Sequence, residues 1–111
     1  MFNHVDLDAA LATADLVITA EGAIDDQTPR GKIPTEVARW AKHYGKPVIA
    51  LAGTIGAAAR VNYNAGIDAY AGILPGPVDL EHALQHGAEY LIDATERALR
   101  LILVGAALTA A

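Results

Sequence analysis

The sequence predicts an α/β domain built on a short, mostly parallel sheet. Apolar, β-branched runs alternate along the chain with stretches of helical spacing, and polar or glycine-rich turns separate them. Strands that alternate with helices form parallel sheets through right-handed crossovers. The elements follow in the order helix, strand, helix, strand, helix, strand, helix. We therefore expect a sheet of about three strands with helices packed on it.

The predicted strands occupy residues 16–20, 48–52 and 69–74. Each is a short apolar run that ends at polar residues, glycine or proline, as strands of parallel sheets do. A sheet of this kind is small, since sheets usually contain about 4–6 strands. Because parallel strands are normally covered on both faces, we expect an incomplete domain that pairs with another chain or belongs to a larger one.

The predicted helices follow from apolar residues at helical spacing. The first covers residues 5–14, and the second begins near Pro34 and ends at Gly45. A short alanine-rich helix ends near Asn64, and a long last helix follows Asp79, which can cap it. The last helix is expected to bury one face, which consists of Leu80, Leu84, Leu91, Ala98, Leu99 and Ile102.

The composition excludes several classes of function. The 111 residues carry a net charge of −5 with scattered acids and bases, so no basic patch supports nucleic-acid binding. The absence of cysteine excludes disulfides and thiolate metal sites. The chain start lacks the pattern of a signal peptide, and Arg100 interrupts an apolar run that is too short for a span of about 20 residues. We therefore expect a cytoplasmic protein without a membrane partner.

The most polar window lies in the stretch DLVITAEGAIDDQTPRGKIP, residues 15–34. The loop predicted there has about a dozen residues, whereas an ordinary connection has roughly 2–6. Open α/β sheets bind ligands at such loops, outside the carboxyl ends of the strands. The candidate functional side chains of the loop are Glu21, Asp25, Asp26, Gln27, Thr28, Arg30 and Lys32.

The charges of this loop are suited to phosphoryl transfer. A carboxylate would hold Mg²⁺ or accept a hydroxyl proton, and Arg30 and Lys32 would neutralise phosphate charge. The alternative is a solvated loop whose charges pair with one another; the position after a buried strand favours function. We prefer Asp25 to its neighbour, because adjacent loop side chains rarely point the same way. Gln27 and Thr28 are candidates for substrate contacts, although Thr28 also fits a turn.

A second candidate, Gly53-Thr54-Ile55-Gly56, follows the second strand. If these residues open a helix, their backbone N–H groups could bind an anion. The segment lacks the lysine of a Walker loop and the full G-x-G-x-x-G fingerprint of dinucleotide binders. A tight turn between strand and helix is therefore the favoured interpretation.

Three motifs, in order, closely resemble the bacterial glycerate kinase family, typified by the glycerate 2-kinases. The family carries DLVITGEGRID-x-QT-x-x-GK-x-P, then PVIAL-x-G, then G-x-D-x-x-x-x-ILP. This chain has DLVITAEGAIDDQTPRGKIP, PVIALAGTIG and GIDAYAGILPGP. The resemblance covers about residues 6–99, and the chain is similar to the C-terminal part of much longer, two-domain proteins. It departs from the family at Ala20 and Ala23, which replace a glycine and an arginine, and at Ala57 and Ala58.

The resemblance implies a Rossmann-like three-layer α/β/α fold and ATP-dependent phosphorylation of D-glycerate, or of a similar 2-hydroxy acid, with Mg²⁺. It implies catalytic roles for Glu21, Asp25 and Lys32, with Asp25 also a metal ligand. Substrate contacts are assigned to Gln27, Thr28 and Arg30, where Arg30 would compensate for the arginine missing at Ala23. We assign cofactor binding to the strand-end residues Gly53, Thr54 and Gly56.

Two functional classes remain for the chain by itself. In the first, residues 1–111 form a single α/β domain that supplies part of a kinase site. The missing N-terminal portion of the enzyme, or a further copy in a homo-oligomer, would complete it. In the second, the chain is a catalytically inactive, truncated module that self-associates through its sheet edge or its apolar helices. A dinucleotide-binding Rossmann protein is disfavoured, because the fingerprint is absent.

Overall fold

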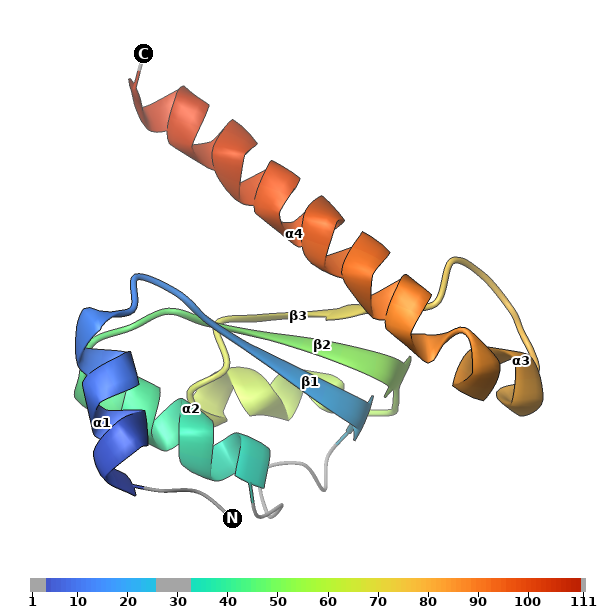
Figure 1. Cartoon of the computed structure of the whole chain (residues 1–111), viewed down its shortest axis with the longest axis horizontal. Coiled ribbons are helices and arrows are strands. Elements are labelled where there is room, and N and C mark those ends of the chain that lie inside the picture. Colours follow the sequence, from blue (N-terminus) through green and yellow to red (C-terminus); the bar gives the residue numbers. More distant parts are fainter. Residues whose placement is uncertain (1–3, 26–32, 111) are drawn as a thin grey trace.

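The computed structural model describes residues 4–25 and 33–110, which form a parallel sheet with helices on both faces (Figure 1). The strands lie in the order β1-β2-β3 and comprise β1 (Val17–Ile24), β2 (Val48–Ile55) and β3 (Ala69–Gly72). The helices are α1 (His4–Thr13), α2 (Ile33–His43), the 3-10 helix η2 (Ala59–Ala65), α3 (Leu80–Gln85) and α4 (Gly87–Ala110). The structure confirms the predicted α/β class and the three-stranded parallel sheet.

The pairing of β1 with β2 continues beyond the ends that the sequence predicts. Glu21 pairs with Ala52, and the ladder runs on until Ile24 pairs with Ile55. The prediction that the loop begins at Glu21 was therefore wrong, and so was the end placed after Ala52. Glutamate and glycine are poor strand formers, but the backbone ladder satisfies their N–H and C=O groups regardless of the side chain.

The main core lies between the sheet and the layer formed by α1, α2 and η2. Its buried members are Leu11, Ile24, Ala38, Ala41, Val48, Ala50, Ala52, Ala59 and Ile67. Most of them are alanines, so the helices approach the sheet closely, and the larger rings of Trp40, Tyr44 and Tyr70 pack around them. Leu51 points to the other face and is also buried, as expected for the central strand of a parallel sheet.

Asp68 joins three elements at the amino end of the sheet, far from the polar loop. Its carboxylate accepts a hydrogen bond from Lys42 Nζ, at the end of α2, and another from the backbone N–H of Val48 at 2.7 Å. The bond from Lys42 is the main reason that the pKa of Asp68 lies below its ordinary value. Gly45, with φ of 68°, ends α2 and lets the chain turn into β2.

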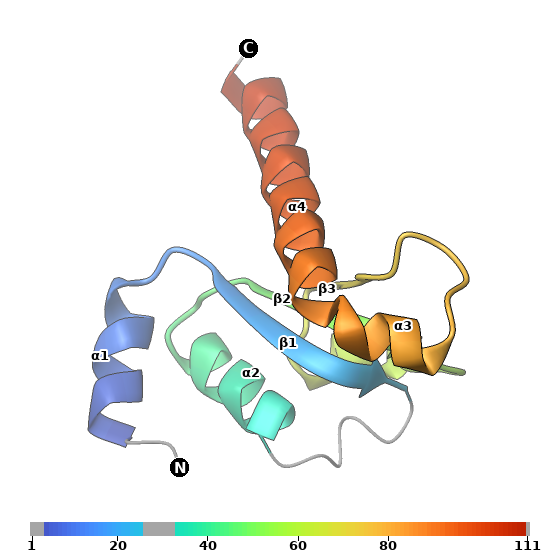
Figure 2. The ribbon, with the colours of Figure 1, turned by 45° about the vertical axis from the view of Figure 1, so that its right-hand side comes forward.

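The last helical region is two helices rather than the one predicted. Asp79 caps α3 as expected, since its side chain accepts a hydrogen bond of 2.8 Å from the backbone N–H of His82. The chain then bends at His86 and continues as α4. The first half of α4 lies on the sheet face opposite α1 and α2, where Ala94 is buried (Figures 1 and 2). Helices on both faces confirm the three-layer arrangement.

The second half of α4 projects away from the sheet (Figures 1 and 2). Its large apolar side chains are exposed on several sides, and they include Leu99, Leu101, Ile102, Leu103, Val104 and Leu108. Leu80 and Leu84 of α3 are each 74% exposed. The predicted buried face was therefore wrong at Leu80, Leu84, Leu99 and Ile102. The spacing was helical, but the described part of the chain leaves 39–74% of the surface of each of these residues exposed. Among the described helices, none has the length and apolar character needed to cross a membrane.

Candidate functional site

A cleft of about 500 Å³ lies at the carboxyl ends of β1 and β2. Glu21 and Gly22 line it from β1, and Gly53 and Thr54 line it from β2. Apolar residues after β3 and on α3 form the rest of its wall, namely Ile73, Leu74, Val78, Leu80, Ala83 and Leu84, together with Gly87. The volume suits a small molecule, and this edge of a parallel sheet is where such folds bind ligands.

Glu21 is the charged residue among those that line this cleft. It belongs to the β1–β2 ladder, which fixes its backbone, and its side chain is half-buried. Burial raises the pKa of the Glu21 carboxyl above its ordinary value. A carboxylate with a raised pKa holds a proton more readily than an ordinary one, which suits the position to acid–base chemistry.

Asp25 follows β1 directly, and the segment after β2 holds it in place. Its backbone carbonyl accepts a hydrogen bond of 2.9 Å from the side-chain amide of Asn62. The N–H of Gly56 donates to the carbonyl of the preceding residue, Ile24, at 2.7 Å. Asp25 therefore lies at the same sheet edge as Glu21, although it is not among the residues that line the cleft.

The predicted turn at Gly53-Thr54-Ile55-Gly56 was wrong. The first three of these residues continue β2, and the N–H of Gly56 is already bonded to Ile24. The helix that follows, η2, begins only at Ala59. Gly53 is needed for strand packing, because a Cβ atom there would lie 3.0 Å from the carbonyl oxygen of Gly22. The residues assigned to the cofactor thus lie at the carboxyl end of β2, or directly after it, and do not open a helix.

The remaining predicted site residues are Asp26, Gln27, Thr28, Arg30 and Lys32, and they lie outside the described residues. Their roles stay predictions. Within the described part of the chain, the structure brings Glu21, Gly53 and Thr54 together at the cleft and places Asp25 beside Gly56.

Sequence reasoning missed Asn62, which is fully buried in η2. Its side-chain amide donates to the carbonyl of Asp25 and, at 2.8 Å, to the carbonyl of Ala59. The only signal in the sequence was a polar side chain in a short, alanine-rich helix next to the first strand's loop. That signal is weak, because the hydrogen bond to Asp25 joins residues 37 positions apart.

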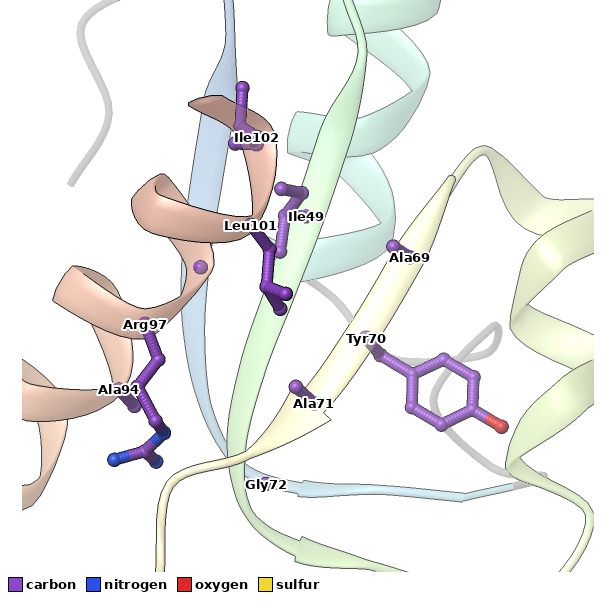
Figure 3. A pocket seen from close by; sticks show the side chains of 10 residues that line it. Ile49, Ala69, Tyr70, Ala71, Gly72, Ala94, Arg97, Leu101 and Ile102 are labelled. Atoms are coloured by element: carbon purple, nitrogen blue, oxygen red, sulfur yellow. The ribbon is translucent and has the colours of Figure 1, made fainter. Parts of the chain in front are cut away.

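A second cavity, of about 410 Å³, lies between α4 and the sheet (Figure 3). Its lining is mainly apolar and includes Ile49, Ala69, Ala71, Gly72, Ala94, Ala98, Leu101 and Ile102. Its one charged residue, Arg97, is paired with Asp93 on the same helix. Tyr70 turns away from α4 and stacks on Tyr63, with ring centroids 5.1 Å apart (Figure 3). Without a carboxylate in its lining, this cavity does not offer the chemistry found beside β1.

Comparisons with known proteins agree with the motifs. The model of the glycerate kinase family matches residues 1–103. The chain belongs to the glycerate kinase family. A glycerate kinase from Bacillus subtilis (strain 168) is 51% identical over 87 residues, which are 78% of this chain and 23% of that protein. A glycerate 2-kinase from Escherichia coli (strain K12) is 34% identical over 101 residues, or 91% of this chain and 26% of that protein.

A solved structure shows the same likeness. The crystal structure of a protein from Salmonella typhimurium LT2, named glycerate kinase 2, matches with a TM-score of 0.51 and 38% sequence identity. The match covers 86% of this chain and 24% of that chain. The chain thus spans about a quarter of the length of these relatives. The family resemblance and the fold class that the sequence predicted are confirmed.

The raised pKa of Glu21 predicts that Glu21→Gln raises the free energy of unfolding of the chain at pH 7. The folded state disfavours the ionised carboxylate, so it holds the proton more tightly than the unfolded state, whose pKa is 4.5. The gain in the free energy of unfolding should therefore be present at pH values above the raised pKa. It should disappear as the pH falls below 4.5, where the carboxyl is neutral in both states.

Urea unfolding measured across this pH range tests the prediction. Glu81→Gln is the control, because Glu81 is exposed on α3 and its replacement should change stability by less than about 0.5 kcal/mol. The prediction would be contradicted if Glu21→Gln did not raise the free energy of unfolding at pH 7, or if its gain over the wild type grew as the pH fell.

Proposed function

We propose that this chain supplies part of the active site of a kinase that transfers the γ-phosphoryl group of ATP to D-glycerate. The observation that carries the proposal is Glu21, a residue that lines the cleft at the carboxyl ends of β1 and β2 and whose half-buried carboxyl has a raised pKa. Membership of the glycerate kinase family supports the choice of reaction.

Phosphoryl transfer relies on positioning and on stabilisation of charge more than on covalent chemistry. We assign Glu21 as the general base. A glycerate hydroxyl oxygen forms a bond to the γ-phosphorus while the bond between that phosphorus and the β-phosphate oxygen breaks and ADP leaves. The hydroxyl proton passes to the Glu21 carboxylate. The β1–β2 ladder holds the Glu21 backbone rigidly, as a base of this kind requires.

Asp25 is proposed as the protein ligand for Mg²⁺. This ion is usually held by one or two carboxylates together with phosphate oxygens and water, and Asp25 offers one such carboxylate. When bound, Mg²⁺ would neutralise charge on the transferring phosphates. Gly53 and Thr54 line the cleft together with Glu21 and are proposed to face the nucleotide. Arg30 and Lys32 remain the proposed contacts to phosphate or carboxylate.

The rest of a longer protein is proposed to complete the cleft. The relatives are about four times as long as the matched segment. A kinase must enclose ATP and its acceptor together and exclude water, which requires more than one open wall. The exposed apolar residues Leu80 and Leu84, on the cleft's outer wall, offer a surface for that missing part.

In a complete kinase that carries this segment, Glu21→Gln is expected to lower kcat by about 10²–10⁴-fold. The amide has the size of the carboxylate but cannot accept the hydroxyl proton. A coupled assay for ADP release with Mg-ATP and D-glycerate measures the effect. Asp93→Asn, on the surface of α4, is the control and should leave kcat unchanged. A Glu21→Gln enzyme with the parent's kcat would rule out the assigned base.

The exposed half of α4 supports a second candidate, a non-catalytic module. Under this proposal the chain associates with further copies of itself through α4. Leu101, Leu103 and Leu108 are 72%, 68% and 76% exposed, and a helix that is apolar on several sides is normally covered. Both outer strands of the sheet, β1 and β3, also have an edge that no described strand covers.

This second candidate predicts that the chain alone forms a dimer or larger oligomer, and that Leu103→Glu shifts it towards the monomer. The charge would have to be desolvated in the interface, whereas it stays in water on the monomer. Sedimentation equilibrium at high micromolar concentration measures the change, with Asp93→Asn as the matched control on the same helix. A wild-type chain that is monomeric under these conditions would exclude the candidate.

A further inference from the structure

We infer that Asn62 is a positioning residue of the proposed site, because its buried side chain fixes the backbone at Asp25. The inference rests on the proposed function, in which Asp25 binds Mg²⁺. Asn62 lies in η2 and is fully buried, so it contacts neither solvent nor substrate. It acts through the backbone of another residue and is not itself a catalytic group.

The contacts of Asn62 join three parts of the fold. Its Nδ2 atom donates to the carbonyl oxygens of Asp25 at 2.9 Å and Ala59 at 2.8 Å, which uses both protons of the amide. Its backbone carbonyl accepts hydrogen bonds from Gly66 and Ile67, in the turn that enters β3. The end of β1 is therefore tied, through one residue, to η2 and to the start of β3.

The orientation of the Asn62 amide is fixed by the same contacts. A reversed amide would place its oxygen against the two carbonyl oxygens that now accept its protons. The Oδ1 atom is buried and has no hydrogen-bond partner within residues 4–25 and 33–110. A buried polar side chain lowers stability unless its hydrogen bonds compensate. The side-chain bond that reaches beyond η2 is the one to Asp25, so holding Asp25 is the distinctive role of this side chain.

Gly56 lies close to the side chain of Asp25. A Cβ atom at Gly56 would lie 2.8 Å from the Cβ of Asp25 and 3.5 Å from the carbonyl oxygen of Ile24. The N–H of Gly56 donates to that same carbonyl. Asp25 therefore lies between Gly56 and Asn62. We call these two residues, Gly56 and Asn62, the β1 clamp. The clamp sets the direction in which the chain leaves β1, and a displacement of about 1 Å at a catalytic group can lower a rate by about 10²-fold.

The clamp predicts that Asn62→Ala, in the complete kinase, lowers kcat by about tenfold or more while KM for D-glycerate changes less than about threefold. The matched control is Asp68→Ala, which removes the hydrogen bonds from Lys42 and Val48 at the opposite end of the sheet. Both variants should lower the melting temperature, but only Asn62→Ala should lower kcat. Assays are run below both melting temperatures and normalised to the folded fraction from circular dichroism.

Asn62→Ser keeps one hydrogen-bond donor at this position. It replaces Asn62→Ala in the test if the alanine variant does not fold. Its kcat should lie between those of the wild type and of the fully impaired enzyme. In this chain itself, hydrogen exchange at the Gly56 amide should be faster in either Asn62 variant than in Asp68→Ala. This second readout does not depend on catalysis, so it tests the clamp even if the kinase proposal fails.

Two results would overturn the inference. The first is a kcat that is the same in the Asn62 variant and in Asp68→Ala. The comparison is made in a kinase in which Glu21→Gln abolishes turnover. The other is a Gly56 amide whose exchange is the same in the Asn62 and Asp68 variants. Failure of the proposed function would show differently, as a Glu21→Gln enzyme that retains full turnover.

Discussion

The parallel pairing of β1 with β2 is the constraint on which the rest of this structure depends. Since the ladder runs on to Ile24 and Ile55, it carries Glu21 into the sheet and sets it beside Gly53 and Thr54 at one edge. A glutamate in a flexible loop would be solvated and screened. In the strand it is half-buried, and burial raises the pKa of its carboxyl. The chemistry proposed here follows from that placement.

The sequence was informative where local pattern and tertiary structure agree. Alternating apolar runs and helical spacing predicted the order of elements and the parallel sheet. The strand ends were missed because glutamate and glycine are poor strand formers, yet a neighbouring strand supplied their hydrogen bonds. Asn62 was missed because its bond to Asp25 joins distant segments, which no local pattern reveals. The buried face expected for the last helix failed at Leu99, since periodicity predicts a face but not what covers it.

The exposed surfaces and the family relationship lead to the same view of the molecule. The sheet is small, the second half of α4 is apolar and uncovered, and the relatives are about four times longer than the matched segment. Leu80 and Leu84, which form part of the cleft wall, are each 74% exposed. These observations support the proposal that the rest of a longer kinase covers the exposed apolar residues and completes the cleft.

The most direct test places this segment in a related glycerate kinase, in place of the matching quarter, and measures glycerate-dependent ADP release. The account predicts turnover by the chimaera, none by this chain alone, and loss of turnover when Asp25 of the inserted segment is changed to alanine. A chimaera that melts like its parent and turns over equally well with and without the Asp25 carboxylate would contradict it.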